Sequence, residues 1–501
     1  LGACAGRPPG ADFPKHESVA IPQSERSPLG RPFGGAARQH PGDSAFRVIS
    51  VGADGFRIRA QLIDAAQQSL DLQYYIFRGD ETGRMLTEHL LRAADRGVRI
   101  RVLIDDGDTV AGDEQILRLM NHRAVELRIY NPAKYRGHIR FVRRLEFVLN
   151  AGRLDYRMHD KLLVADNAVA LIGGRNIGNQ YFQIDPESQF ADDDVFSAGP
   201  IVADLSRVFD EFWNSEWAIP AEALGRPHES VRKTKPGGID YAALIANGEP
   251  FNGIMSGQLP VSWAPAQLVY DSPNKKRVLS GAIQGALIVP EVEKSIRAVH
   301  SEMLLITPYL VPSADELQAL QELRHHKVRV RILSNSLESC PEISAQSGYD
   351  KYRVPFLKGG VELYEVRSRL GSTRGSGQSV KISRHGNYAL HGKLYVFDRK
   401  KILIGSMNFD QRSQHINTEI GVIIDSPDIA QQTAQRFENM VKPENSYALS
   451  LSPAGSAGDS RLIWRTKDNN RDVEFHREPA RSGWQRLEAK VLTLLPLDRE
   501  L

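Results

Sequence analysis

Two hydrophobic periods alternate along the chain after residue 45, and together they predict a mixed α/β protein. Short apolar runs at 69–77 and 97–105 have the length and composition of buried strands. Residues 56–69 and 83–97 instead place apolar side chains three and four positions apart, which is the spacing of an amphipathic helix. Alternation of the two periods indicates an α/β sandwich built on a mostly parallel sheet.

The same order of elements occurs again in the second half of the chain. Apolar runs at 303–311 and 327–335 alternate with helical patterns at 290–301 and 314–326. A repeat of about 230 residues is too long for a solenoid unit and indicates a duplicated domain. Breaker residues are dense at 226–265, as in a connector. The expected organisation is a flexible N-terminal segment at 1–44, a first domain at 45–225, the connector at 226–265, a second domain at 266–445 and a C-terminal extension at 446–501.

One set of polar residues occurs in both copies with the same internal spacing. The stretches are "MHDKLLVADNAVALIGGRN" (158–176) and "LHGKLYVFDRKKILIGSMN" (390–408), and each residue of the second set lies 232 positions after its counterpart. The two sets are His159, Lys161, Asp166 and Asn176, and His391, Lys393, Asp398 and Asn408. Residues i and i+2 of a strand share a face, so each histidine and its lysine should point together.

The two motif aspartates are expected to have a different role from the histidines. Each lies seven residues past its histidine and directly before a predicted hairpin turn. An odd spacing on a continuing strand turns the side chain to the opposite face. We therefore expect Asp166 and Asp398 to hold the turn, unless the strand bulges.

The residues that follow each turn are suited to binding a phosphoryl group. The returning strands end in "GGRN" and "GSMN", where glycines allow a close approach and a helix beginning there would direct N–H groups at an anion. Two lysines and two asparagines would bind the oxygens, and two histidines would supply a nucleophile and a general acid without a metal or a cofactor. Gly174 stands where the second copy has Ser406, so a hydroxyl would be present on one side alone. A single motif could be an accident of a polar strand edge, but two matching copies favour duplicated chemistry.

Composition narrows the possible classes of protein. With 501 residues the chain can form two or three domains, and its 41% apolar and 25% charged residues are ordinary for a globular protein. The formal net charge of +3 does not resemble that of a nucleic-acid binder. No run of eighteen apolar residues occurs. Two cysteines, Cys4 and Cys340, exclude a disulfide scaffold and a cysteine-built metal site.

The first residues suggest a lipid anchor. Leu-Gly-Ala-Cys, ending at Cys4, resembles the lipobox of bacterial lipoproteins, and the Gly-, Pro- and Arg-rich residues 5–44 are typical of a flexible tether. We expect lipidation of Cys4 and a location at a bacterial membrane, outside the cytoplasm. The alternative is a chance match in a disordered tail.

The paired motifs resemble the H-x-K-x4-D-x6-G-[GS]-x-N pattern of the phospholipase D superfamily. This resemblance implies two halves around a pseudo-twofold axis with one shared active site. One histidine attacks phosphorus to form a phosphohistidine, and the other protonates the leaving alcohol and later deprotonates the incoming one. Family habit favours His159 as the nucleophile and His391 as the general acid. The implied catalytic residues are His159, Lys161, Asp166, His391, Lys393 and Asp398; the implied phosphate-binding residues are Asn176, Asn408, Ser406 and Gly174.

Members of this superfamily also use an acidic residue beyond each motif to orient a histidine. Aligning Pro427 with Pro200 places Glu419 over Asp192, and these two are the candidates, with Asp194 as the second choice in the first half. A neighbouring carboxylate would set the tautomer and stabilise the imidazolium. The alternative for both sites is a solvated acidic loop.

Longer stretches narrow the resemblance to one group of the superfamily. "LDLQYYIF", "RAADRGVRIRVLIDD", "GGRNIGNQYF" and "GSMNFDQRSQHINTEIG" are similar to bacterial cardiolipin synthases, particularly those of the C type. The resemblance covers nearly the whole chain after residue 45. It implies transfer of a phosphatidyl group to phosphatidylglycerol through a phosphatidyl-histidine, with phosphatidylglycerol or phosphatidylethanolamine as donor and without nucleic acid as a partner.

A basic amphipathic segment could bring such an enzyme to a membrane. Residues 135–153 place Phe141, Leu145, Val148 and Leu149 at helical spacing. Four arginines could meet anionic headgroups: Arg136, Arg140, Arg143 and Arg144. The alternative is a surface helix packed on the core.

Other activities of the superfamily stay open at this point. A phospholipase D hydrolase would share every motif, because water and alcohol compete for one intermediate. A nuclease is disfavoured by the balanced charge, and tyrosyl-DNA phosphodiesterases usually lack the motif aspartate. A non-catalytic lipid-binding protein would be expected to lose a motif histidine or lysine, and this chain keeps all four.

Overall fold

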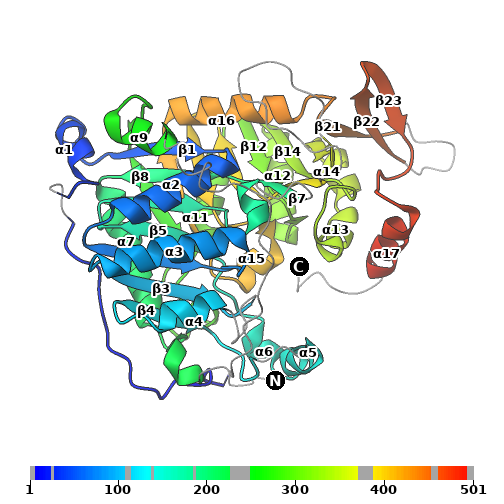
Figure 1. Ribbon diagram of the computed structural model, residues 1–501. Coiled ribbons are helices and arrows are strands. Elements are labelled where there is room, and N and C mark those ends of the chain that lie inside the picture. Colours follow the sequence, from blue (N-terminus) through cyan, green and yellow to red (C-terminus); the bar gives the residue numbers. More distant parts are fainter. Residues whose placement is uncertain are drawn as a thin grey trace. The chain divides into compact units, whose positions relative to one another are not determined.

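The computed structural model describes residues 6–23, 27–107, 114–136, 140–183, 188–225, 249–369, 387–452 and 461–493 (Figure 1). The chain divides into two compact units, and each unit includes a short segment from the other half of the sequence. The first unit comprises Leu1–Ile184, Asp193–Ile288 and Ile416–Val422; the second comprises Asp185–Asp192, Val289–His415 and Ile423–Leu501.

The first unit is built on a nine-stranded mixed sheet with the order β10-β1-β8-β6-β5-β2-β3-β4-β9. Its central strands β2, β3 and β4 are parallel, whereas β5 and β6 form an antiparallel hairpin beside β2. The expected mostly parallel sheet is therefore mixed, because the hairpin that carries the first motif runs against its neighbour. The strands are β1 (Ser44–Ile49), β2 (Ser69–Tyr74), β3 (Arg99–Asp105), β4 (Val125–Tyr130), β5 (Lys161–Ala165), β6 (Val169–Gly173), β8 (Asp194–Ala198), β9 (Ala218–Pro220) and β10 (Ser262–Ala264).

Helices cover both faces of this sheet, as the alternation of side chains along β2 requires. Leu70 and Leu72 enter a hydrophobic cluster with residues of α2 and α3. Asp71 points to the opposite face and pairs with Arg101 at 2.7 Å, and Arg101 also pairs with Asp210 of α7. The helices of this unit are α1 (Arg31–Ala37), α2 (Gly52–Ala65), α3 (Glu81–Asp95), α4 (Glu114–Met120), α5 (Arg140–Leu149), α6 (Ala151–Leu154), η1 (Asn179–Phe182), α7 (Pro200–Asn214), η2 (Ala221–Leu224), α9 (Glu249–Ser256) and α10 (Lys275–Leu279).

The second unit repeats the central arrangement of the first. Strands β12, β14 and β15 are parallel, and the hairpin β17–β18 lies antiparallel beside β12, as β5–β6 lies beside β2. Within its ten-stranded sheet, the strands that lie wholly in this unit follow the order β18-β17-β12-β14-β15-β21-β22-β23. These strands are β12 (Glu302–Ile306), β14 (Arg329–Asn335), β15 (Glu362–Val366), β17 (Leu394–Phe397), β18 (Lys401–Gly405), β21 (Ser446–Leu451), β22 (Leu462–Asp468) and β23 (Arg471–Phe475).

The remaining elements belong to the second unit, except β11, which lies in the first, and β20 and α11, which span the boundary between the two. Two short pairs, β7 with β16 and β13 with β19, are both parallel. The helices are α11 (Ile288–Arg297), α12 (Ala314–His325), α13 (Ile343–Asp350), α14 (Arg353–Lys358), α15 (Gln411–His415), α16 (Pro427–Met440) and α17 (Gly483–Thr493). The other strands are β7 (Ser188–Ala191), β11 (Ala266–Tyr270), β13 (Leu310–Val311), β16 (Asn387–Leu390), β19 (Phe409–Asp410) and β20 (Ile420–Asp425).

The described part of the N-terminal segment differs from the expected flexible tether. Its main chain is tied to the first unit: the Ala20 N–H donates to the Asp210 carboxylate at 2.8 Å, and Arg128 donates to the His16 carbonyl at 2.7 Å. Phe33 of α1 is buried. A Gly- and Pro-rich composition signals weak intrinsic structure, but it cannot show that polar side chains elsewhere will bind the backbone. Cys4 lies outside the described residues.

The second part of the expected connector at 226–265 is not a connector but forms regular elements of the first unit. Residues 226–248 lie outside the described residues, but α9 and β10 belong to the first unit. Phe251 and Ile254 join its core, and β10 pairs with β1. The C-terminal extension supplies β21, β22, β23 and α17 to the second unit.

Candidate active site

His159 lies immediately before β5, in the first unit, and is held there by main-chain bonds. Its N–H donates to the Thr418 carbonyl at 2.9 Å, and the Thr418 N–H donates to the Arg157 carbonyl at 2.9 Å. The Met158 N–H donates to the Asp105 carboxylate at the end of β3, also at 2.9 Å. The backbone on both sides of the histidine is therefore fixed before its side chain makes any contact.

The His159 ring is oriented by a carboxylate that lies 260 residues away in sequence. Its Nδ1 is 2.9 Å and 3.0 Å from the two carboxylate oxygens of Glu419, and both residues are buried within the first unit. Such contact favours a proton on Nδ1 and leaves the Nε2 lone pair available for attack. The Tyr75 ring packs edge-on against the imidazole, with 5.0 Å between the two ring centres. The Lys161 ammonium lies 5.3 Å from the centre of the Tyr75 ring and donates a hydrogen bond to the His159 carbonyl.

Glu419 is in turn positioned by a buried ion pair that the sequence analysis did not single out. The Asp271 N–H donates to the Glu419 carbonyl at 2.9 Å, and the Glu419 N–H donates to the Asp271 carboxylate at 3.0 Å. Lys275 donates to Asp271 at 2.8 Å and to the Asn417 carbonyl at 2.8 Å. Burial raises the pKa of the Asp271 carboxyl to about 6, although the Lys275 ammonium acts in the opposite direction.

Asp160, between the motif histidine and lysine, is a second residue that the sequence analysis missed. Its side chain is buried and accepts a hydrogen bond from the Gln73 amide at 2.7 Å. Burial raises its pKa well above the usual range, and the neighbouring Glu419 carboxylate acts in the same direction. The corresponding residue of the second motif is Gly392, and this difference between the copies was the available signal.

His391, in the second unit, is placed by the parallel pairing of β16 with β7. The N–H groups of His391 and Gly392 donate to the Ala191 carbonyl at 2.7 Å and 2.9 Å. The next residue, Asp192, places a carboxylate oxygen 2.5 Å from His391 Nδ1. The Phe190 ring stacks on the imidazole at 5.3 Å, and the Lys393 ammonium lies 2.9 Å from Nδ1.

The two orienting carboxylates are exchanged relative to the order of the sequence. Glu419 follows the second motif but contacts His159, and Asp192 follows the first motif but contacts His391. The second choice, Asp194, does not contact a motif histidine. Instead it forms a buried ion-pair cluster with Arg59 at 2.7 Å and Arg175 at 3.0 Å, because the alternation of β8 turns it into the first unit.

The motif aspartates contact main-chain amides and not histidines. Asp166 accepts hydrogen bonds from the N–H groups of Gln68 at 2.8 Å and Ser69 at 3.0 Å, at the start of β2. Asp398 accepts from Ser301 at 2.7 Å and Glu302 at 3.0 Å, at the start of β12. Both aspartates have a φ of 52°, as the hairpin turn requires.

The residues after each returning strand differ partly from expectation. Asn176 accepts a hydrogen bond from the Ile76 N–H at 3.1 Å, and Asn408 and Ser406 are buried. The Gly174 N–H donates to the Asp193 carbonyl at 3.0 Å and is therefore engaged within the protein. The expected helix does not begin at either asparagine: η1 and α15 begin three residues further on, at Asn179 and Gln411.

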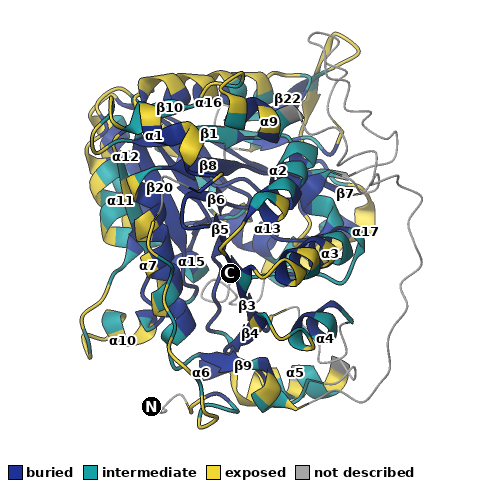
Figure 2. Cartoon of the chain, turned by 60° about the vertical axis from the view of Figure 1, so that its left-hand side comes forward, coloured by how far each residue is buried: buried dark blue, intermediate teal, exposed yellow. Residues whose placement is uncertain are grey.

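Residues 140–149 of the expected segment form α5, and part of its ribbon is coloured as exposed in Figure 2. Phe141, Val148 and Leu149 are 73%, 72% and 73% exposed, so the alternative of a face packed on the core is wrong. Arg143 donates to the Asp106 carbonyl at 3.2 Å and Arg136 pairs with the Asp106 carboxylate at 3.1 Å. Arg143 thus ties α5 to Asp106 of the first unit, and Arg136 ties the chain before the helix to the same residue. Within the described ranges, no helix combines the length and the apolar character that crossing a bilayer requires.

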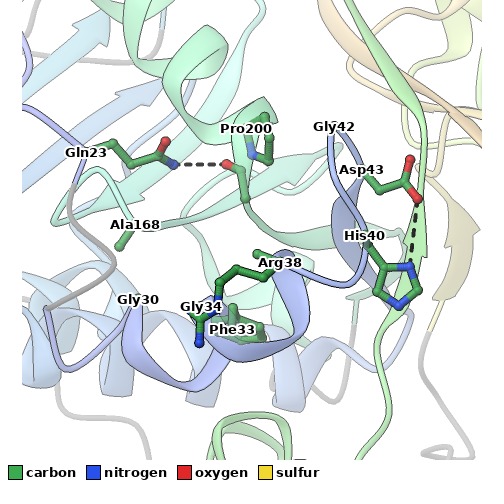
Figure 3. A pocket seen from close by; sticks show the side chains of 12 residues that line it. Gln23, Gly30, Phe33, Gly34, Arg38, His40, Gly42, Asp43, Ala168 and Pro200 are labelled. Carbon is green, nitrogen blue, oxygen red and sulfur yellow. Dashed lines mark hydrogen bonds and ion pairs between the residues drawn. The ribbon is translucent and has the colours of Figure 1, made fainter.

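A separate hollow lies on the first unit beside α1 (Figure 3). Phe33, Arg38, His40 and Pro200 are among the residues that line it, and the Gln23 amide donates to the Gly199 carbonyl at its edge, at 3.0 Å. Ala168, in the hairpin turn of the first motif stretch, is among its lining residues, but none of the motif histidines, lysines, aspartates or asparagines lines it, so it is not part of the candidate active site.

Comparison with known proteins gives consistent similarities. The family model described as "Cardiolipin synthase, PLD-like domain" matches residues 60–213 and 292–441. The chain is 33% identical over 475 residues to cardiolipin synthase C of Escherichia coli (strain K12), covering 92% of this chain and 97% of that protein. It is 25% identical over 401 residues to the major cardiolipin synthase of Bacillus subtilis (strain 168), covering 79% and 68%. The crystal structure of phosphatidylserine synthase from Haemophilus influenzae Rd KW20 matches with a TM-score of 0.55 at 13% identity, covering 83% and 91%, which concerns the fold alone.

Proposed function

The chain belongs to the family of PLD-like cardiolipin synthases, and from this premise we propose that it is a phosphatidyltransferase. It would make cardiolipin from phosphatidylglycerol and a second phospholipid, which is phosphatidylglycerol or phosphatidylethanolamine. The observation that carries the proposal is the pair of buried histidines, each with a carboxylate at Nδ1 and a lysine two residues on.

In the proposed reaction, the two histidines act in one shared active site. His159 Nε2 attacks the phosphorus of the donor lipid and forms an N–P bond, while the P–O bond to the leaving alcohol breaks. His391 gives its Nε2 proton to that alcohol. It then removes a proton from the glycerol hydroxyl of phosphatidylglycerol, whose oxygen displaces His159 and releases cardiolipin. Glu419 and Asp192 would stabilise the imidazolium forms.

Each motif histidine has its own orienting carboxylate, Glu419 within the first unit and Asp192 within the second. Lys161, Lys393 and the amides of the two motif asparagines would neutralise and bind the phosphoryl oxygens.

Membrane association would place this site at its lipid substrate. The exposed apolar residues of α5, among them Phe141, Val148 and Leu149, support insertion into the headgroup region. Lipidation of Cys4 stays a prediction, and it would hold the protein at a membrane outside the cytoplasm.

The deciding experiment is incubation of the purified protein in mixed micelles with phosphatidylglycerol, with and without phosphatidylethanolamine, followed by lipid mass spectrometry. We expect cardiolipin from the unaltered protein and none from His159→Ala or His391→Ala. His122→Ala is the matched control, because this histidine pairs with Asp95 at the surface and is remote from both motifs in sequence. Phosphatidic acid without cardiolipin would identify a hydrolase instead. A covalent lipid adduct that survives His159→Ala but not His391→Ala would reverse the roles of the histidines.

A further inference from the structure

The C-terminal helix α17 of the second unit turns its large apolar side chains outward. Trp484, Leu487 and Val491 are 79%, 50% and 54% exposed. Their spacing of three and four residues places them on one face of the helix. The residues on the inner side are Gln485 and Ala489, which are 6% and 7% exposed. The apolar side chains of α17 therefore face outward and its buried positions hold a polar and a small residue, which is the reverse of a helix packed on a core.

Polar contacts hold α17 in this orientation. The Gln485 amide donates to the Leu337 carbonyl at 2.6 Å and accepts from the Arg481 N–H at 2.8 Å. Arg486 donates to the Glu478 carbonyl at 2.7 Å, and Arg481 donates to the Cys340 carbonyl at 3.2 Å. Rotating the helix to bury Trp484 would break these bonds, because they all lie on the inner side or at its start.

We propose that the outward face of α17 inserts into the headgroup region of a phospholipid bilayer. This inference rests on the proposed function, since it names a second surface through which the enzyme reaches its lipid substrate. Tryptophan is favoured at the boundary between headgroups and acyl chains. Arg477 and Lys490 are exposed basic side chains in this region, against the exposed acidic side chain of Glu488, and they complement an anionic surface.

The size of the face favours a bilayer over a second copy of this chain. A stable protein interface buries roughly 800 Å² on each partner, with about 20 to 30 residues a side. Three side chains provide far less than that, whereas a few aromatic and aliphatic side chains are sufficient for interfacial insertion.

The test is sedimentation of the full chain with vesicles made of equal amounts of phosphatidylglycerol and phosphatidylcholine. We expect the variant Trp484→Ser/Leu487→Ser/Val491→Ser to bind these vesicles about tenfold more weakly. Val19→Ser, which also removes an exposed apolar side chain, is the matched control and should bind normally. Unchanged binding of the triple variant would overturn the proposal.

A second measurement tests insertion without depending on the fold of the triple variant. The fluorescence of Trp484 should be quenched by lipids that are brominated on their acyl chains. The variant Trp484→Phe should still bind the vesicles, but the quenching of protein fluorescence that Trp484 contributes should disappear. Absence of this difference would overturn the proposal. A change from dimer to monomer in the triple variant, with vesicle binding intact, would overturn it in favour of self-association.

Failure of this proposal can be separated from failure of the proposed function. His159→Ala should bind vesicles as the unaltered protein does, and the triple variant should keep full transferase activity on a short-chain, water-soluble phosphatidylglycerol. If the unaltered protein makes no cardiolipin from that soluble lipid or from micelles, the proposed function is wrong while the vesicle result stands.

Discussion

Each motif histidine meets a buried carboxylate at Nδ1, but the other neighbours of the two rings differ. His159 faces both oxygens of a glutamate and the edge of Tyr75, whereas His391 faces one oxygen of an aspartate and the flat side of Phe190. Duplication therefore preserved the reactive groups while their surroundings diverged. Unequal surroundings suit unequal roles, since one histidine must bond to phosphorus and the other must exchange protons.

Asp160 offers a test of how the first motif is tuned. Burial raises its pKa well above the usual range and so favours the neutral form, whose shape asparagine nearly matches. We expect Asp160→Asn to keep kcat within about twofold of the unaltered enzyme. The matched change Glu419→Gln removes the charge that stabilises the imidazolium and should lower kcat by about 10²- to 10⁴-fold. Steady-state kinetics on micelles would measure both. Equal losses in the two variants would mean that Asp160 is ionised.

Helix α12 carries a buried carboxyl group, that of Glu316, whose pKa is raised. Ser313 and Glu316 form a reciprocal capping box at its N-terminus, in which the Ser313 N–H donates to Glu316 at 3.0 Å. Burial raises the pKa of Glu316 to about 8, although the bonds from Ser313 and Gln414 act in the opposite direction. The local signal for a helix start was therefore present in the sequence, but the burial of its glutamate was not.

Glu316 should make the stability of the second unit depend on pH. Its folded-state pKa lies above the unfolded value of 4.5, so its stabilising contribution is complete below that pH and is lost as pH rises through about 8. Glu316→Gln keeps a capping side chain that does not titrate. We expect thermal unfolding followed from pH 5 to 9 to show a smaller fall in Tm for the variant than for the unaltered protein. Parallel curves would contradict the assignment.

The orienting carboxylates reach the motif histidines through two exchanged segments. Each unit includes one segment from the other half of the sequence. Residues 416–422 bring Glu419 into the first unit, and residues 185–192 bring Asp192 into the second. In the first unit, Asp271 and Lys275 bind the incoming segment through its main chain. The orienting carboxylate of His159 is thus supplied by long-range assembly, and its position depends on that buried ion pair.

Lys275→Met tests this dependence. Removing the ammonium leaves the Asp271 carboxyl buried without its charge partner, which we expect to destabilise the protein by about 3–5 kcal/mol. It should also lower kcat more than it changes KM, because Glu419 would lose its anchor. Urea unfolding and steady-state kinetics measure the two effects. Lys276→Met, at an exposed neighbouring position, is the control, and the double variant Asp271→Asn/Lys275→Met should recover part of the stability. A Lys275 variant as stable and active as the control would contradict this role.

The duplication, the strand–helix order and the spacing of the histidines, lysines and aspartates could all be predicted from the amino-acid sequence. These are local or repeated properties, and hydrophobic periods and matching motifs express them directly. The contacts of Glu419 with His159 and of Asp192 with His391, the support of Glu419 by Asp271 and Lys275, and the outward face of α17 with Trp484 could not be predicted in this way. Periodicity specifies which face of an element is apolar. The partner of a buried charge or of an outward face depends on long-range packing, which no local pattern records.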